Sequence, residues 1–349
     1  MVDARNPLEV PGAWDKLTAW LVQAGTDIGA ITGTEKFSVG QSNPTYKITT
    51  SHGIFVLRTQ PSGPLLKSAH AVDREYRVMS ALAGSNVPVP SMIAVCEDIE
   101  VLGVKWFLMG FVKGTTFTDP TLATLPSHQR SDLYFAQIDV LAALANTNPD
   151  LLGLQGFGKP TGYLERQYHV WTRQYRASEM ETLPEMEFLI ETLPKVMPVY
   201  DHACCVVHGD FRLDNLLFDD NQNVLAVIDW ELSTLGPPLV DLSYWCTMLR
   251  MQAHWPIGGL GGIDRAECAV PSESDLTSRF AEKTGITIPD DWEIWIGFHC
   301  FRFAAILQGI RKRVADGNAS ADNASEVGAQ AIPVAKMGAE ILSNGLKMS

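Results

Sequence analysis

The chain has 349 residues, 46% hydrophobic and 19% charged, which is enough apolar material for two domains or one large domain. Its formal net charge of −13 makes a nucleic-acid backbone a poor partner. A transmembrane helix needs an apolar run of about 18 residues, and the chain contains none. Its first residues do not have the pattern of a secretion signal.

Six cysteines are scattered along the chain, with no Cys-x-x-Cys pair and no regular spacing. That distribution predicts neither a zinc site nor a disulfide framework. It favours a reducing, cytoplasmic setting.

The first 112 residues predict a small α+β unit. Two runs rich in β-forming residues flank the turn Ser51-His52-Gly53, and apolar side chains recur at helical spacing before Gly25 and again before Gly84. Closely spaced antiparallel strands with a helix over one face are typical of an α+β lobe. The predicted elements are helices at 14–24 and 70–83, and strands within 37–49, 53–61, 93–96 and 104–112.

Beyond Gly114 the pattern becomes mainly helical, with two short strands at 205–210 and 223–230. We therefore expect an N-terminal lobe over residues 1–112 and a larger C-terminal lobe over 113–349. The predicted helices of the second lobe lie near 127–147, 163–178, 184–197, 239–251, 273–284, 291–314 and 325–344.

Most of the unusual polar residues follow those two short strands. The first strand leads into His208 and Asp210, Asn215 comes five residues after Asp210, and the second strand ends at Asp229. Phosphoryl transfer needs a carboxylate to accept the hydroxyl proton and separate oxygen ligands for Mg²⁺. Asp210 suits the first role, while Asn215 and Asp229 suit the second. His208 is interpreted as scaffold and Asp214 as a second acid or a loop residue; turn-capping is the alternative for the acidic residues.

The stretches HGDFRLDNLLFD and VIDWE resemble the aminoglycoside phosphotransferase-like kinases. Further stretches resemble the branch related to the kinase domain of acyl-CoA dehydrogenase family members 10 and 11: GQSNPTYKIT, VLRTQPSG, AHAVDREYRVMSAL, RQYHVWTRQY and DWELSTLG. The similarity covers about residues 30–250. It implies a bilobal, protein-kinase-like fold that binds ATP and Mg²⁺ between its lobes.

The resemblance also implies roles for single residues. Asp210 is similar to the catalytic base, with Asn215 and Asp229 as metal ligands. Arg58 occupies the place of the strand lysine that holds ATP phosphates, and its guanidinium can bind phosphate oxygens as a fork. Glu75 resembles its partner on the following helix, although a solvated helix carboxylate is the simpler interpretation.

The remaining nucleotide contacts are implied by two loops. Gly40-Gln41-Ser42-Asn43 resembles the loop that covers the phosphates, although this sequence is a turn signal in any protein. The stretch from Met109 through Gly110 to Val112 resembles the connector whose main chain pairs with adenine. Asp241 is expected to brace the catalytic loop, and Pro237 departs from the aspartate that relatives often carry.

Two features bear on the phosphate acceptor. Arg166, His169 and Arg173 are spaced to share a helix face, which suits an anionic acceptor or an ordinary solvated face. Residues 264–293 hold eight acids and three bases, which suits a polycationic aminoglycoside or a solvated rim.

We therefore expect a kinase that phosphorylates a hydroxyl group of a small molecule, with a hydroxyacyl-CoA or related acyl compound as the leading acceptor. An aminoglycoside or macrolide kinase is one alternative. A nucleotide-binding module without turnover is the other, and the complete set of Asp210, Asn215 and Asp229 argues against it.

Overall fold

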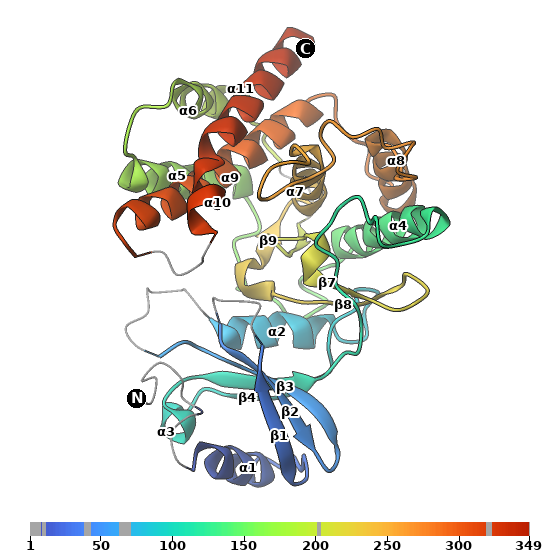
Figure 1. The fold of residues 1–349 in the computed structure, drawn as a ribbon, viewed down its shortest axis with the longest axis vertical. Helices are drawn as coiled ribbons and strands as arrows, with labels where there is room; N and C mark the ends of the chain where they lie inside the picture. Colours follow the sequence, from blue (N-terminus) through green and yellow to red (C-terminus); the bar gives the residue numbers. More distant parts are fainter. Residues whose placement is uncertain are drawn as a thin grey trace.

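A small sheet-rich lobe and a larger, mainly helical lobe make up the described chain, which confirms the predicted α+β, bilobal fold (Figure 1). None of the helices in the described part of the chain is both long and apolar enough to cross a membrane. The computed structural model describes residues 8, 12–37, 43–62, 71–200, 204–318 and 323–348.

The N-terminal lobe is built on a five-stranded antiparallel sheet in the order β1-β2-β3-β5-β4. Successive side chains of a strand point to opposite faces. In β5, Phe107 accordingly meets Tyr76 of helix α2 (ring centroids 6.2 Å apart), whereas Trp106 meets Trp20 of helix α1 (5.0 Å). The sheet is therefore covered by one helix on each face. The elements are α1 Ala13–Gln23, β1 Ile31–Lys36, β2 Thr45–Thr50, β3 Gly53–Thr59, α2 Val72–Leu82, β4 Met92–Cys96, α3 Ile99–Leu102 and β5 Trp106–Gly110.

The first strand lies earlier than predicted. A strand was expected from Phe37 onward, but β1 occupies Ile31–Lys36 and pairs with β2. Its side chains are almost all exposed, because β1 is an edge strand. An edge strand of this kind lacks the alternation of apolar and polar residues on which strand prediction depends.

The C-terminal lobe is a set of helices around α9, which contacts α5, α6, α7, α10 and α11. Most side chains in the first two thirds of α9 are buried, so this helix forms the centre of the lobe. The helices are α4 Ser127–Ala145, α5 Tyr163–Ser178, α6 Pro184–Val196, α7 Leu239–Arg250, α8 Glu273–Thr284, α9 Trp292–Ala315, α10 Ala324–Ala329 and α11 Ala331–Met348.

The C-terminal helix predicted over 325–344 is instead two helices, α10 and α11, which meet at Gln330. The buried side chain of Gln330 accepts from the Ile257 N–H (3.0 Å) and donates to the Ile257 carbonyl (2.8 Å). The break thus places this amide where it can bind a distant loop.

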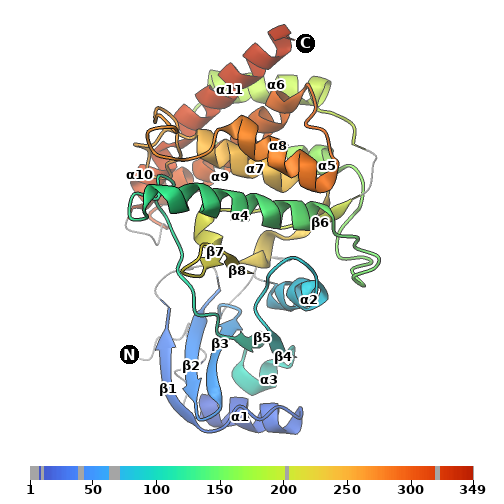
Figure 2. The ribbon, with the colours of Figure 1, turned by 90° about the vertical axis from the view of Figure 1, so that its right-hand side faces the viewer.

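Two short two-stranded antiparallel sheets lie where the lobes meet, between the large helices and α2 (Figure 2). The Val227 N–H donates to the Pro88 carbonyl at 2.9 Å, and Thr115 pairs with Phe218. Thr115 thus pairs with a strand of the C-terminal lobe. We propose that the boundary between the lobes lies between residues 112 and 113. The first sheet pairs β6 Cys205–Val207 with β9 Thr234–Gly236, and the second is the hairpin of β7 Leu216–Phe218 with β8 Val224–Val227.

Candidate active site

The loop after β6 is fixed by main-chain contacts before any ligand is considered. His208 is fully buried; its Nε2 lies 3.0 Å from the Ile228 carbonyl, and its Nδ1 accepts from the Asp210 N–H at 3.2 Å. A carbonyl only accepts and an amide N–H only donates, so the ring is the neutral tautomer with its proton on Nε2. Gly209 adopts φ 85°, and a Cβ there would lie 2.7 Å from the Leu232 carbonyl oxygen. This turn therefore requires glycine.

Two buried charged side chains hold the same loop from behind. Asp241, near the start of α7, accepts from the His208 N–H (2.7 Å) and the Gly209 N–H (2.9 Å). Arg302 of α9 donates to the Gly209 carbonyl at 2.7 Å. Burial raises the pKa of Asp241 above its ordinary value. The loop is thus tied at both its N–H and its C=O groups.

The Asp210 carboxylate accepts two hydrogen bonds. The Tyr244 hydroxyl donates to Oδ1 at 2.6 Å and the Asn215 amide donates to Oδ2 at 3.3 Å. Burial and the neighbouring Asp210 raise the pKa of Tyr244 well above 10, so its hydroxyl keeps the proton it donates. The guanidinium of Arg212 lies 3.9 Å from Oδ1. About 29% of the Asp210 side chain is exposed, which leaves the carboxylate accessible to a further donor.

Asn215 is tied to both strands of the site. Its Nδ2 donates to the Asp210 carbonyl at 2.9 Å, and its own carbonyl accepts from the Ile228 N–H at 2.9 Å. Asp229 directly follows Ile228 in the chain and has a left-handed backbone conformation with φ 66°. Such a conformation is uncommon for residues other than glycine, although aspartate adopts it more readily than most. The hairpin therefore holds Asn215 close to the backbone turn that presents Asp229.

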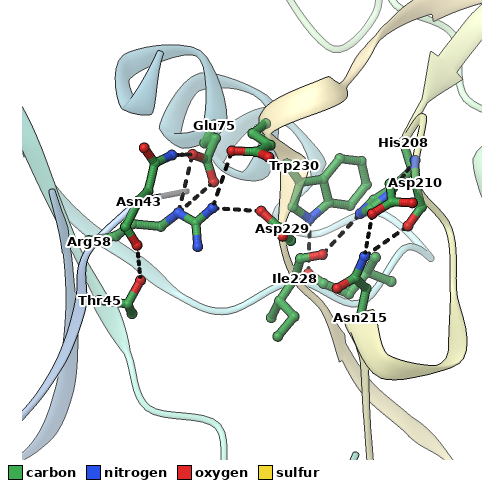
Figure 3. Close-up of polar contacts among 12 residues, drawn as sticks. Asn43, Thr45, Arg58, Glu75, His208, Asp210, Asn215, Ile228, Asp229 and Trp230 are labelled. Atoms are coloured by element: carbon green, nitrogen blue, oxygen red, sulfur yellow. Dashed lines mark hydrogen bonds and ion pairs between the residues drawn. The ribbon is translucent and has the colours of Figure 1, made fainter. Parts of the chain in front are cut away.

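Arg58 lies in a second cluster, on the N-terminal-lobe side of the same junction (Figure 3). Its Nε lies 3.0 Å from a Glu75 oxygen, and its Nη2 donates to Asp229 at 2.6 Å. Glu231 lies 4.0 Å from the same Nη2, and Asn43 donates to Glu75 at 2.8 Å. The guanidinium of Arg58 thus lies within 4.0 Å of three carboxylates.

Glu75 is the most buried of these carboxylates, with 1% of the residue exposed, so it is not a solvated helix residue. Burial raises its pKa to about 7, and the repulsion of Asp229 and Glu231 adds to the rise, while the attraction of Arg58 opposes it. The sharing of the Arg58 guanidinium between Glu75 and Asp229 is the physical feature that distinguishes this cluster.

The predicted adenine connector has a main chain that is already partly used. The Gly110 N–H donates to the Ser91 carbonyl at 2.8 Å, and the Phe111 N–H donates to the Ile54 carbonyl at 3.2 Å. Within the described ranges, the main chain of Val112 makes no hydrogen bond, so Val112 rather than Gly110 can offer its N–H to a ligand. Gly40, Gln41 and Ser42, predicted to cover the phosphates, lie outside the described residues.

Within the described residues, the side chains predicted to bind an anionic acceptor make no hydrogen bond or ion pair with Asp210. Arg166 donates to the Lys159 carbonyl at 3.0 Å, while His169 and Arg173 are exposed. They occupy the face of α5 opposite Tyr168 and Tyr175, which are buried in the lobe. A role of these three side chains in acceptor binding stays a prediction.

Three side chains that sequence reasoning did not assign do reach the catalytic loop. Arg212 follows Asp210 by two residues, and Tyr244 lies one helical turn after Asp241 on α7, so both positions could have been found from spacing. Arg302 is almost a hundred residues away, and no local pattern marks it.

Comparison with known proteins agrees with this geometry. The family model described as "Phosphotransferase enzyme family" matches residues 33–273. The chain belongs to this family, whose kinase-like members transfer phosphoryl groups, and the assignment supports a small-molecule phosphotransferase.

Two curated relatives carry acyl-CoA dehydrogenase names. The chain is 41% identical to acyl-CoA dehydrogenase family member 10 of Mus musculus over 84% of its length, and 38% identical to family member 11 of Gallus gallus over 88%. These alignments cover 28% and 40% of the respective relatives, so the chain spans less than half of either protein.

Solved structures agree on the fold. A Ralstonia eutropha protein described as a candidate aminoglycoside phosphotransferase superposes with a TM-score of 0.87 and 40% identity, covering 95% of this chain and 98% of that one. An aminoglycoside phosphotransferase in complex with ADP and hygromycin B superposes with a TM-score of 0.60 at 16% identity, covering 93% and 98% of the two chains. The second similarity concerns the fold alone.

Proposed function

We propose that this protein transfers the γ-phosphoryl group of ATP, with Mg²⁺, to a hydroxyl group of a small molecule. The observation that carries the proposal is the Asp210 carboxylate, oriented by Tyr244 and Asn215 next to the strand end that presents Asp229. In this scheme Asp210 accepts the proton of the attacking hydroxyl. The oriented carboxylate costs no reorganisation when the proton arrives, since its donors are already in place.

The donor set fits a hard divalent cation. Asn215 Oδ1 and Asp229 Oδ2 make no hydrogen bond within the described ranges, and both are oxygen ligands of the kind Mg²⁺ prefers. Bound Mg²⁺ supplies positive charge that offsets the phosphate oxygens during transfer. Asp229 shares the Arg58 guanidinium with Glu75, so a bound cation would add to the charge balance of the Asp229 carboxylate.

Arg58 is proposed to hold a phosphate oxygen. Its Nε and Nη2 are engaged by Glu75 and Asp229, which fix the plane of the guanidinium. Its Nη1 has no hydrogen bond to any described residue and remains free to donate. Glu75 and Asn43 then act by orienting Arg58, and the main chain of Val112 is proposed to meet adenine.

For the acceptor we propose a hydroxyacyl-CoA or related acyl compound. The named relatives are acyl-CoA dehydrogenase family members, which supports an acyl substrate. The acidic segment gives little support to a polycation, because several of its acids have internal partners. Glu273 and Glu293 both bind Arg250, at 2.6 Å each, and Asp275 caps α8. We place this reaction in the cytoplasm, which suits the six free thiols of the chain.

The test is a direct comparison of acceptors. We expect kcat/KM to be higher for a 4-hydroxyacyl-CoA than for kanamycin, measured by ADP release with one enzyme preparation. A clear preference for kanamycin would make this an antibiotic kinase. A rate of ADP release that does not increase when either acceptor is added would refute the proposed acceptor class.

A further inference from the structure

An apolar cavity of about 190 Å³ lies beside the catalytic loop, on the C-terminal-lobe side. It is enclosed by the segment after β5, by α4, by α7 and by the loop that follows α7. Its apolar wall is formed by Phe117, Tyr134, Trp245, Met248, Leu249 and Ile257.

Three polar side chains of the wall, Tyr134, Gln137 and Trp245, already make hydrogen bonds within the protein. The Tyr134 hydroxyl donates to the Pro120 carbonyl at 2.5 Å, and Gln137 accepts from the Trp245 indole N–H at 3.0 Å. The Gln137 amide group donates back to the Leu133 carbonyl. With these bonds made, the interior offers a ligand mainly carbon surface, which suits a hydrocarbon chain.

One wall is a loop whose position is fixed from two sides. Gln330 binds both main-chain groups of Ile257. A Cβ at Gly259 would lie 2.2 Å from the Met248 carbonyl oxygen, so only glycine lets the loop approach α7 this closely. Ile257 therefore lines the cavity from a main chain that is held by contacts independent of its own side chain.

The charged rim connects the cavity to the chemistry. Arg212 and Asp214 both line the cavity, and they form an ion pair with each other. The Arg212 Nε is also 3.9 Å from Asp210 Oδ1. A ligand in the cavity is thus separated from the candidate base by a single side chain, that of Arg212.

We propose that this cavity receives the alkyl chain of the acceptor and sets the chain length that the enzyme accepts. The inference rests on the proposed phosphoryl transfer to a hydroxylated acyl compound. An apolar cavity of about 150 Å³ in another protein stays dry and binds benzene, so this volume suits a short alkyl chain. Each methylene group that enters should strengthen binding until the cavity is full.

The experiment measures affinity for a series of saturated, unhydroxylated acyl-CoAs by calorimetry, so that no turnover is needed. We expect about fourfold tighter binding for each added methylene, from about 0.8 kcal/mol per buried CH₂, followed by a plateau. Ile257→Phe should bring the plateau to shorter chains and Ile257→Ala should move it to longer ones. Ile99→Phe, at an exposed position of α3, is the matched control and should leave the plateau unchanged.

Affinity that does not depend on chain length, or a plateau that stays in place in both Ile257 variants, would overturn the proposal. If Ile257→Phe does not fold, Ile257→Ala decides the question by itself. Failure of the proposed function has a different signature, because the chain-length dependence would then persist in binding while no hydroxyacyl-CoA is phosphorylated.

Discussion

The two polar clusters at the lobe junction differ in how their charge is balanced. Around Asp210, one carboxylate accepts from Tyr244 and Asn215 and has Arg212 nearby. Around Arg58, a single guanidinium stands among three carboxylates, one of them fully buried.

This difference indicates that the two clusters have different roles. The hydrogen-bond donors to Asp210, and the side chains that hold its loop, all come from the C-terminal lobe. The Arg58 cluster shares one guanidinium among several carboxylates and joins the two lobes through Asp229. We infer that the first cluster handles the proton of the acceptor, while the second handles the cation and the phosphates.

The largest effect is expected at Asp210. Asp210→Asn keeps the shape of the side chain but removes the proton acceptor, so turnover should fall about 10²–10⁴-fold while ATP affinity stays at the wild-type value. Steady-state kinetics and ATP titration of the same preparation check both parts. Asp220→Asn, at an exposed acid in the β7–β8 turn, is the control. Turnover at the wild-type rate in Asp210→Asn would remove the proposed base.

A second effect concerns pH and the buried Glu75. Its pKa is raised from 4.5 to about 7, so the native state holds this proton more tightly than the unfolded state. The associated stability is present below about pH 4.5 and is lost as pH rises through about 7, for a total of about 3 kcal/mol.

Denaturant unfolding at a series of pH values, without nucleotide, measures this loss. The stability of wild type relative to Glu75→Gln should decrease between pH 5 and 8. Glu100→Gln, which changes an exposed glutamate of α3, should show no such trend. Parallel pH curves for wild type and Glu75→Gln would contradict the assignment.

Arg58 should affect nucleotide more than acceptor. Losing a hydrogen bond to a charged group costs about 1.5–3 kcal/mol, so Arg58→Ala should raise the KM for ATP by about tenfold to a hundredfold. Arg58→Lys should keep part of the affinity, because the charge remains and the fork is lost. Lys36→Ala, on the exposed edge strand, serves as the control. An ATP KM that does not change in Arg58→Ala would rule out the phosphate contact.

The smallest effect is expected at Tyr244. Tyr244→Phe keeps the ring and removes one donor to Asp210, so kcat should fall by about three- to tenfold, as for a single hydrogen bond. Tyr168→Phe, on α5, removes a comparable bond to the Ile190 carbonyl of α6 and should not alter kcat. Equal losses in both variants would mean that Tyr244 acts only on stability.

The sequence predicted most of the helices and the Asp210 cluster because their signals are local. Asp210 and Asn215 are five residues apart on one loop, and α5 and α8 have the predicted bounds. The edge strand β1 was misplaced because its exposed side chains carry no periodic pattern. Arg302 was missed because its contact with Gly209 depends on the packing of α9 under the loop, and packing between distant elements leaves no trace in local spacing.

The acceptor prediction shows the same limit. Arg166, His169 and Arg173 do share a face of α5, as their spacing indicated, but that face points away from the lobe. Spacing predicts which residues lie together on a helix, and only the packing of that helix decides where they point.

The most direct test of the account is to follow the phosphoryl group itself. The enzyme is incubated with γ-³²P-labelled ATP, Mg²⁺ and a 4-hydroxyacyl-CoA, and the labelled products are separated. The account predicts label in a phosphate ester at the hydroxyl carbon of the acyl compound with wild type, and none above background with Asp210→Asn. Label recovered only as inorganic phosphate, or an ester formed equally by both enzymes, would contradict it.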